Sequence, residues 1–255
     1  MKTDFEDQLN QLDEDYLPKH IGIIMDGNRR WAAIRNLMYR EGHIQGVKAA
    51  ISTIQAAKEL GIKTLTLFVF STENWQRPIQ EVKSLISLFR LYLWRMKKAI
   101  NDEQIRLHTI GDLSAFPTSL QKIIINIKDA TKTNKDFNLI LAINYGGRDE
   151  IRRAIIRLIK NHQKIPMDLE QFTEKDFATY LDTADWQDPD LLIRTSGEKR
   201  ISNFLLWQIS YTELYISDTL WPDFTRKDLL EAILEYQQRI RRLGCLLYTS
   251  PSPRD

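Results

Sequence analysis

The chain has 255 residues, enough for one large α/β domain or two small ones. Hydrophobic residues make up 43% of it and charged residues 27%, a balance typical of a soluble protein with a packed core. The formal net charge is only +2, which argues against general electrostatic binding to nucleic acid but leaves room for a local basic pocket. The single cysteine, Cys245, excludes an internal disulfide framework and a cysteine zinc site, and it fits a reducing compartment.

The two ends of the chain differ from its middle. Residues 1–17 are acidic and polar and lack the apolar core of a signal peptide. No apolar run approaches the roughly 18 residues of a membrane-spanning helix, so we expect a cytoplasmic protein that meets a membrane only peripherally. Residues 245–255, CLLYTSPSPRD, break the pattern of the preceding helix, and their Ser-Pro repeats predict a disordered or non-native tail.

Apolar runs with strand character alternate with helical periodicity along the chain. Strands are expected at residues 21–25, 62–70, 105–112, 137–147, 190–198, 203–208 and 213–217. Helices are expected around residues 47–57, 80–99, 120–131, 148–160 and 227–243. This alternation predicts βαβ units and one α/β domain, with a mostly parallel central sheet flanked by helices on both faces.

Polar clusters follow four of the expected strands. They are DGNRRW (26–31), STENWQRP (71–78), NYGGRDE (144–150) and RTSGEKRISN (194–203). Ligands of such sheets bind outside the carboxyl ends of the strands, so the four clusters should form one rim. The rim offers several arginines, whose forked donors match phosphate oxygens, and few acids. We therefore expect a polyphosphate there, held partly through Mg²⁺, an ion that takes one or two carboxylates plus substrate oxygens.

Each member of this set also has a simpler interpretation. A single arginine is more often a solvated surface residue, Trp31 and Trp75 could be core aromatics, Asp26 could cap a helix, and Gly27 could serve only a turn. The chain lacks GxxxxGK[ST], a GxGxxG that opens a helix, GxSxG and DDxxD. His43 and His108 lack metal-ligand spacing, and we expect His108 to be structural. The convergence of the clusters, rather than any one of them, favours a site.

The motifs HIGIIMDGNRRWA, FSTENWQRP, NYGGRDEI, DLLIRTSGEKRISNFLLWQ and ELYISDTLWPDF resemble the cis-prenyltransferases, most closely the bacterial undecaprenyl diphosphate synthases. The resemblance covers residues 18–244 and implies one domain, a homodimer and an elongated apolar tunnel. It implies repeated condensation of isopentenyl diphosphate onto an allylic diphosphate, usually farnesyl diphosphate. The product would be a long-chain, undecaprenyl-like diphosphate for cell-wall synthesis, and its release would involve transient contact with a membrane surface.

The same resemblance assigns roles to individual residues. Asp26 and Asn74 would be catalytic, and Asp26 and Glu213 would bind Mg²⁺. A carboxamide is a very weak base, so we expect Asn74 to orient the substrate while a diphosphate oxygen takes the proton. The remaining substrate-binding residues would be Gly27, Asn28, Arg29, Arg30, Trp31, His43, Ser71, Thr72, Glu73, Trp75, Arg77, Arg194, Arg200, Ile201 and Ser202.

Some positions depart from the family pattern. Tyr39 stands where many members have arginine, with Arg40 one place on, and Lys199 stands where some have histidine. Tunnel walls are expected from Leu85, Ile86, Phe89 and Leu93 and from alternate residues of two strands. Val69 and Phe137 look bulky there, which predicts a product of the undecaprenyl length or shorter. The alternative is that both residues pack into the core away from the tunnel.

Two other functions compete with the enzyme. One is a non-catalytic partner subunit of the same fold, and the other is an unrelated protein that binds or hydrolyses phosphate esters. Asp26, Asn28 and Arg30 are all present in the first motif, which favours the enzyme over the partner subunit.

Overall fold

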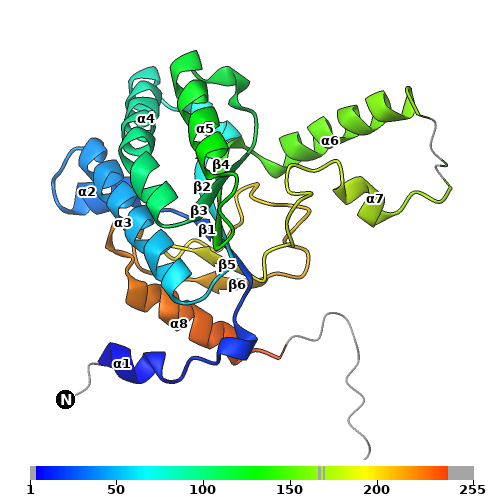
Figure 1. Cartoon of the computed structure of the whole chain (residues 1–255). Helices are drawn as coiled ribbons and strands as arrows, with labels where there is room; N and C mark the ends of the chain where they lie inside the picture. The colour runs from blue at the N-terminus through cyan, green and yellow to red at the C-terminus, as the bar shows by residue number, and fades with distance from the viewer. Residues whose placement is uncertain (1–3, 166–167, 169, 241–255) are drawn as a thin grey trace, which may run out of the picture.

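Six parallel strands form the centre of the computed structural model, which describes residues 4–165, 168 and 170–240 (Figure 1). The expected tail at 245–255 lies outside these residues. The sheet order is β3-β4-β2-β1-β5-β6, and every neighbouring pair is parallel, as the alternation of elements predicted. The strands are β1 (His20–Ile24), β2 (Thr64–Ser71), β3 (Ile105–Ile110), β4 (Phe137–Tyr145), β5 (Leu191–Arg194) and β6 (Glu213–Ile216).

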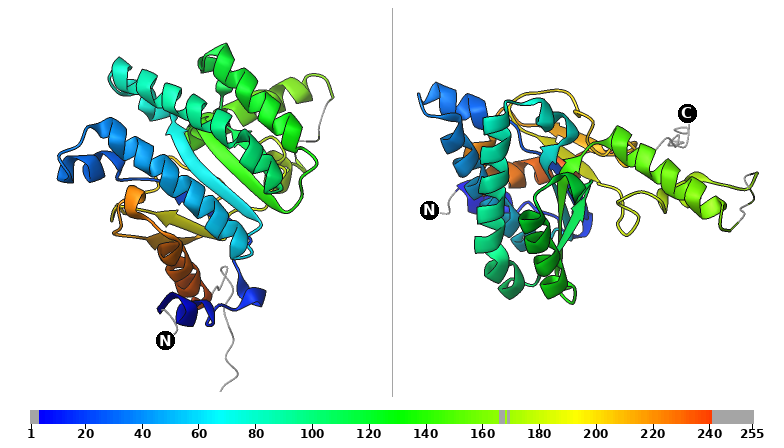
Figure 2. Two further views of the ribbon diagram at one scale, coloured as in Figure 1. Left: turned by 60° about the vertical axis from the view of Figure 1, so that its left-hand side comes forward. Right: turned by 90° about the horizontal axis from the view of Figure 1, so that it is seen from above.

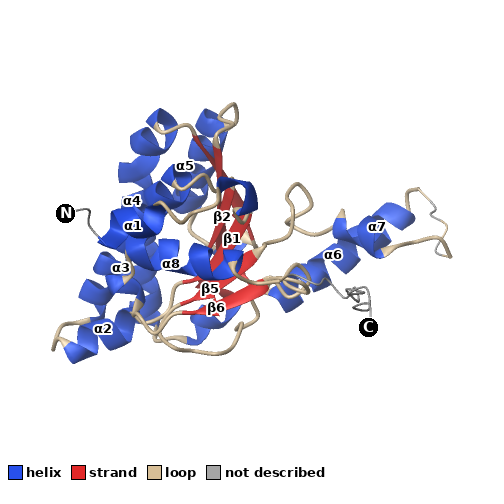
Figure 3. Ribbon diagram, turned by 90° about the horizontal axis from the view of Figure 1, so that it is seen from below, coloured by secondary structure: helices blue, strands red, loops and turns tan. Residues whose placement is uncertain are grey.

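Helices cover the two faces of the sheet unequally. α3, α4, α5 and α8 lie together on one side of the strands, where the larger apolar core forms (Figure 3). On the other side α6 leads away from the sheet toward α7 (Figure 2). The helices are α1 (Asp4–Leu9), α2 (Asn28–Ile34), α3 (Tyr39–Glu59), α4 (Ile79–Asp102), α5 (Thr118–Thr131), α6 (Gly147–His162), α7 (Glu174–Ala178) and α8 (Arg226–Gln237). No helix among the described residues is both long and apolar enough to cross a bilayer.

The strand predicted at residues 203–208 does not form, and this prediction was wrong. Ser202, Asn203 and Leu205 have φ angles of 47°, 63° and 47°, a left-handed backbone that no strand accommodates. Phe204 and Leu205 are buried in a second core beneath the sheet. Their hydrophobicity therefore reflects packing of a turn-rich segment rather than strand pairing.

The acidic N-terminal segment packs against the body of the protein. Phe5, Leu9 and Leu12 are partly buried against the main core. The side chain of Gln237, the last residue of α8, accepts a hydrogen bond from the Asp13 backbone N–H and donates one to its carbonyl. The charged residues of this segment thus occupy the outer side of an amphipathic stretch.

Candidate active site

Asp26 follows β1 and lies between two guanidinium groups from different elements. Arg194 ends β5, directly opposite Ile24 in the register of the sheet. Its Nη2 donates to Asp26 Oδ2 at 2.9 Å, and its Nη1 donates to Ser202 Oγ at 2.7 Å and to the carbonyl of Arg200. On the other side, Arg30 Nη2 lies 3.6 Å from Asp26 Oδ1. Arg194 is buried, with 5% of its side chain exposed, whereas Asp26 keeps 31%.

The turn after Asp26 requires glycine. Gly27 has φ = 108°, and a Cβ on it would lie 2.3 Å from Ser196 Oγ. The Thr195 hydroxyl fixes the turn, since it accepts from the Asp26 N–H at 2.9 Å and donates to the Asp26 carbonyl at 2.7 Å. β1 and β5 are thereby joined at the point where both strands end, and the carboxylate is held at the rim.

A second charged cluster lies where α2, α3 and α4 meet. Glu81 is buried and pairs with Arg77 at 3.2 Å and with Arg29 at 3.8 Å. Burial, reinforced by the positive charge of Arg77, lowers the pKa of His43 to about 4, so its imidazole is neutral at pH 7. His43 Nε2 and Asn28 Oδ1 are buried and have no hydrogen-bond partner within the described part of the chain. Both residues also line the apolar cavity described below, so a ligand bound there can supply the missing partner.

The positions that depart from the family pattern surround this cluster. Tyr39 is the first residue of α3, and its ring packs edge-on against His43 with 6.4 Å between centroids. Arg40 is exposed one residue later, where the helix has turned by about 100°. Tyr39 therefore lies beside His43, and Arg40 leaves the helix about 100° away from it. Lys199 is exposed, next to Arg200.

The turn after β2 contributes the third side of the rim. Asn74 Oδ1 accepts the Ser71 backbone N–H at 3.1 Å in a capping box, so its carbonyl is used to shape the turn. Trp75 Nε1 donates to Asn144 Oδ1 at 2.7 Å while its ring packs on Phe70 and Phe116. Thr72 is half-buried in the same turn.

Asn203 connects this turn to the start of α6. Its Nδ2 donates to Glu73 Oε1 at 2.8 Å, its Oδ1 accepts from the Arg148 N–H at 3.0 Å, and its carbonyl accepts from the Gly147 N–H at 2.7 Å. Burial alone would raise the pKa of Glu73, but the hydrogen bonds from Asn203 and from the turn lower it overall. The sequence did not single out Asn203 or Asn144; the only signals were their places inside the NYGG and RISN clusters.

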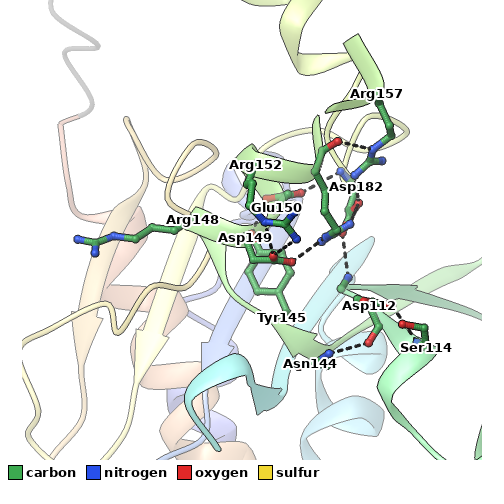
Figure 4. A network of polar contacts seen from close by, with 12 residues as sticks. Asp112, Ser114, Asn144, Tyr145, Arg148, Asp149, Glu150, Arg152, Arg157 and Asp182 are labelled. Atoms are coloured by element: carbon green, nitrogen blue, oxygen red, sulfur yellow. Dashed lines mark hydrogen bonds and ion pairs between the residues drawn. The ribbon is translucent and has the colours of Figure 1, made fainter. Parts of the chain in front are cut away.

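A buried polar network supports this corner from behind (Figure 4). Glu150 Oε2 accepts from the Tyr145 hydroxyl at 2.6 Å and from Gln208 Nε2 at 3.0 Å, and its Oε1 accepts from the Asp182 N–H at 2.9 Å. Asp182 in turn binds Arg153 and Arg157. Burial raises the pKa of Glu150. The network ties β4 and α6 to the chain that precedes β5.

Two of the expected site residues, Trp31 and Ile201, make their contacts away from Asp26, whereas Arg200 stays at the rim. Trp31 Nε1 donates to Asp223 Oδ1 at 2.6 Å, with the Arg35 guanidinium 4.3 Å above its ring. Ile201 packs against the second core. Arg200 is largely exposed and pairs with Glu198, which also binds Arg30 at 3.1 Å.

Glu213 does not lie with Asp26 in this chain. It begins β6 opposite Leu191, at the amino end of β5, whereas Asp26 lies at the carboxyl end. Its carboxylate pairs with Arg239 at 2.9 Å. The expectation that both acids bind one metal is therefore not met within one chain. The described residues contain no cluster of three or more histidine, cysteine, aspartate or glutamate side chains that could hold a metal.

An apolar cavity of about 160 Å³ opens beside the cluster of His43 and Asn28. Its walls come from α3, α4 and the facing sides of β2 and β4, and include the expected Leu85, Ile86, Phe89, Leu93 and Val69. Phe137 is not among the lining residues, which corrects its expected place in the wall. It is fully buried and precedes Leu139 by two residues on the same face of β4, so it packs in the core beyond the lined part of the cavity.

Comparison with known proteins gives a single family. A family model described as putative undecaprenyl diphosphate synthase matches residues 24–244. The chain is 48% identical to isoprenyl transferase of Prochlorococcus marinus over 92% of its own length and 86% of the relative's. It is also 48% identical to isoprenyl transferase of Fusobacterium nucleatum, over 91% of this chain and 97% of that protein.

Solved structures agree with this result. Lavandulyl diphosphate synthase from Lavandula x intermedia, in complex with dimethylallyl diphosphate, superposes with a TM-score of 0.86 at 37% identity, covering 89% of this chain and 98% of that one. A probable undecaprenyl diphosphate synthase from Campylobacter jejuni gives 0.74 at 36% identity, again covering 89% and 98%. The charged rim beside an apolar cavity thus belongs to a prenyl-transferring enzyme, and the chain is a member of the undecaprenyl diphosphate synthase family of isoprenyl transferases.

Proposed function

We propose that this enzyme condenses isopentenyl diphosphate repeatedly onto an allylic diphosphate, farnesyl diphosphate in the first instance, and makes a long-chain polyprenyl diphosphate. The observation that carries the proposal is an arginine-rich rim at the mouth of an apolar cavity. A prenyl diphosphate has the same two parts, an anionic head and a hydrocarbon tail. The residues of α4 that line the cavity run from Leu85 to Ile100, about 22 Å along the helix at 1.5 Å per residue, so the apolar wall is longer than one isoprene unit.

The allylic diphosphate is assigned to the turn at Gly27–Arg30 and to His43. Asn28 and His43 line the mouth of the cavity, so a head group bound there directs its tail inward. Neutral His43 offers an N–H donor without adding charge, while Arg29 and Arg77 supply the charge nearby. Buried unpartnered atoms at this position favour a bound ligand.

Isopentenyl diphosphate is assigned to Arg200, Ser202 and Arg194, with Arg77 toward the allylic side. Arg200 and Ser202 are exposed at the rim, and Arg194 is held in place by Asp26. Forked donors with these positions suit diphosphate oxygens. The Glu73–Asn203 contact, with Trp75 and Thr72, holds the intervening turn in place.

Asp26 fits a magnesium ion shared with the substrate. It is a partly exposed carboxylate beside diphosphate-binding arginines, and Mg²⁺ typically takes one or two protein carboxylates plus phosphate oxygens. Bound there, the ion would neutralise charge on the departing diphosphate. Glu213 is left out of this assignment because it is the first residue of β6 and lies at the amino end of the strand, whereas Asp26 lies at the carboxyl end of the sheet.

Breaking the allylic C–O bond places developing negative charge on the diphosphate. Arginines already fixed in position stabilise that charge without reorganising, which is the largest usual term in such catalysis. Asn74 orients the reacting groups through the turn that it caps, and a diphosphate oxygen takes the proton lost from the isopentenyl unit.

We further propose that the enzyme acts in the cytoplasm as a homodimer and that its product is the precursor of a cell-wall lipid carrier. The dimer is supported by Ile155, Ile156 and Ile159, which are exposed along α6 where it extends from the body. Isolated exposed apolar residues are common, but several along one projecting helix favour a protein contact.

One assay separates this proposal from its two rivals. Radiolabelled isopentenyl diphosphate is incubated with farnesyl diphosphate and Mg²⁺, and organic-soluble products are resolved by chromatography. Incorporation into a ladder of longer products is expected, and it should cease when EDTA removes the metal. Absence of incorporation would favour a non-catalytic partner subunit, and release of free phosphate without incorporation would favour a phosphate-ester hydrolase.

A further inference from the structure

The outer face of α4 combines exposed aromatic and aliphatic side chains with unpaired cations. Trp94 is 66% exposed and Leu91 is 41% exposed. At about 100° per residue, four cations of α4 point in nearly the same direction as Trp94; they are Lys83, Arg90, Lys97 and Lys98. Arg95 extends the same side of the helix. All five cations are exposed, and none forms an ion pair with another described residue. We call this set of seven side chains the outer face of α4.

The same helix carries no exposed acid until its last turn. Glu81 is buried in the cluster with Arg77, and only Asp102 is exposed at the C-terminal end. Several surface cations elsewhere in the described part of the chain do sit beside carboxylates, as Arg152 does beside Asp149 and Arg226 beside Glu59. The outer face of α4 is thus a concentrated positive patch on a protein whose net charge is only +2.

The opposite side of α4 is a wall of the apolar cavity. Leu85, Phe89 and Met96 line the cavity, while Arg90 and Trp94 face outward from the same turns. In the fold, α4 lies in the helical layer on one side of the sheet, away from the projecting α6 (Figures 1 and 2). A partner bound to the outer face therefore lies one helix away from the space assigned to the growing hydrocarbon chain.

We propose that the outer face of α4 docks on the surface of an anionic lipid bilayer. Its cations match negatively charged headgroups, and a tryptophan flanked by lysine and arginine is the composition that sits at a membrane–water interface. The significance for product release rests on the proposed function, because only a prenyl product needs delivery to a bilayer. The docking itself is independent of catalysis and is measured without substrate.

Sedimentation with vesicles tests the docking. Purified full-length protein is mixed with vesicles of phosphatidylcholine alone or of equal parts phosphatidylcholine and phosphatidylglycerol. Binding to the anionic vesicles is expected at low salt, with loss at high salt and little binding to the neutral ones. Each surface cation contributes about a fivefold gain in partitioning, so Lys97→Gln/Lys98→Gln should bind about 25-fold more weakly.

Matched variants identify the face. Lys160→Gln/Lys164→Gln removes two exposed cations at the far end of α6, and Tyr211→Ser removes an exposed aromatic ring elsewhere. Both should bind anionic vesicles like the wild type, whereas Trp94→Ser should bind more weakly. The docking would be overturned if both double-lysine variants lost the same amount of vesicle binding. It would also be overturned if the wild type bound no anionic vesicles, or bound neutral and anionic vesicles equally. So would a change in oligomeric state of Trp94→Ser by sedimentation velocity, since the face would then join two copies.

Vesicle docking and the proposed prenyl transfer are tested by independent measurements, so one can be contradicted without the other. Prenyl transfer in detergent, without vesicles, should be unchanged in Trp94→Ser and Lys97→Gln/Lys98→Gln. A protein that pellets with anionic vesicles but incorporates no isopentenyl diphosphate would retain the docking and lose the proposed function. Full incorporation with no vesicle binding would do the reverse.

Discussion

Asp26 gives the rim its balance of charge. Arg194 is too deeply buried to be solvated, and it needs a carboxylate or phosphate partner. Asp26 supplies that partner, and Ser202 and the Arg200 carbonyl satisfy other donors of the same guanidinium. One carboxylate at the end of a core strand therefore positions an arginine from the neighbouring strand, and in the proposed function the same carboxylate would hold Mg²⁺.

Replacing Asp26 should nearly abolish turnover. We expect Asp26→Ala to lower kcat by about 10²-fold or more, as for loss of a major electrostatic group in the transition state. Initial rates of labelled isopentenyl diphosphate incorporation measure it. Because Arg194 loses its partner, circular dichroism must verify the fold, and Asp26→Asn provides a variant that keeps a hydrogen-bond acceptor. Near-normal turnover by a folded Asp26→Ala would contradict the mechanism.

Replacing Arg200 should act on one substrate. Its guanidinium is exposed beside Glu198, so its removal leaves no buried charge unpaired, and Arg200→Ala should fold normally. We expect chiefly a raised KM for isopentenyl diphosphate, because a ground-state phosphate contact is lost. Steady-state kinetics with each substrate varied in turn checks this. Arg152→Ala is the matched control, since Arg152 is equally exposed and also paired with a neighbouring carboxylate. An effect confined to the allylic substrate would reverse the assignment of the two sites.

Sequence motifs predicted the charged side chains of the rim better than the residues that hold them. Asp26 and Arg30 follow β1 and Arg194 is the last residue of β5, so the grouping of polar clusters at strand ends predicted that they meet. Asn144 and Asn203 act from left-handed backbone conformations and through long-range hydrogen bonds, which no periodicity reveals. The motif did not predict the place of Glu213 either. Whether this residue lies at the amino or the carboxyl end of the sheet depends on the register between β5 and β6.

At the scale of elements, α3, α4, β2 and β4 together make the cavity. Leu139 and Leu141 alternate on β4, while Val69 lies in β2 where pairing with β4 is irregular between Phe68 and Ser71. The bulge lets consecutive residues of β2 face the cavity, which strict alternation would forbid. The wall was thus predicted from apolar helical and strand patterns, but the bulge was not.

Enlarging the cavity at Val69 should lengthen the product. Val69→Ala removes two methyl groups from a lining residue, and chromatography of products from a fixed substrate mixture should shift toward longer chains. Phe137→Ala is the contrasting variant, because Phe137 is fully buried beyond the lined part and its loss should cost about 3–5 kcal/mol of stability. Unchanged product length in both variants would show that neither residue sets it.

At the scale of the whole molecule, the alternating pattern predicted a parallel sheet but not its order. Strands β1, β2 and β4 are adjacent in the interior of the sheet. The residues of β1 and β4 are nearly all buried, as are five of the eight in β2, and such a run of hydrophobicity identifies central strands. In the observed order, β5 lies on the side of β1 away from β2. This placement depends on the packing of helices that are far apart in the sequence. That order is what brings Arg194 to Asp26, so the site depends on a topology that the pattern leaves open.

The buried end of β1 gives the whole fold a dependence on acid. His20 is 3% exposed; its Nδ1 lies 2.6 Å from the Gln187 carbonyl and its Nε2 lies 2.7 Å from the Thr66 hydroxyl. The carbonyl can only accept, so Nδ1 carries the proton and Nε2 accepts from Thr66. Burial lowers the pKa of His20 from 6.5 to about 4 in the folded protein.

Stability should therefore fall as the pH drops from 7 to 5. Between pH 6.5 and 4 the unfolded chain binds a proton at His20 that the folded chain does not, so through this group acid favours unfolding by about 2 kcal/mol at pH 5. His43, whose pKa is also lowered to about 4, adds a loss of its own that is the same in the wild type and in a His20 variant. Urea unfolding at both pH values, at constant ionic strength, measures the loss. His20→Gln should lose about 2 kcal/mol less than the wild type over this interval, whatever its stability at pH 7. Carboxylates with lowered pKa values, such as Asp182, lose their contribution only at lower pH, outside the interval. An equal loss in both proteins would mean that His20 is not the group that makes the fold acid-sensitive.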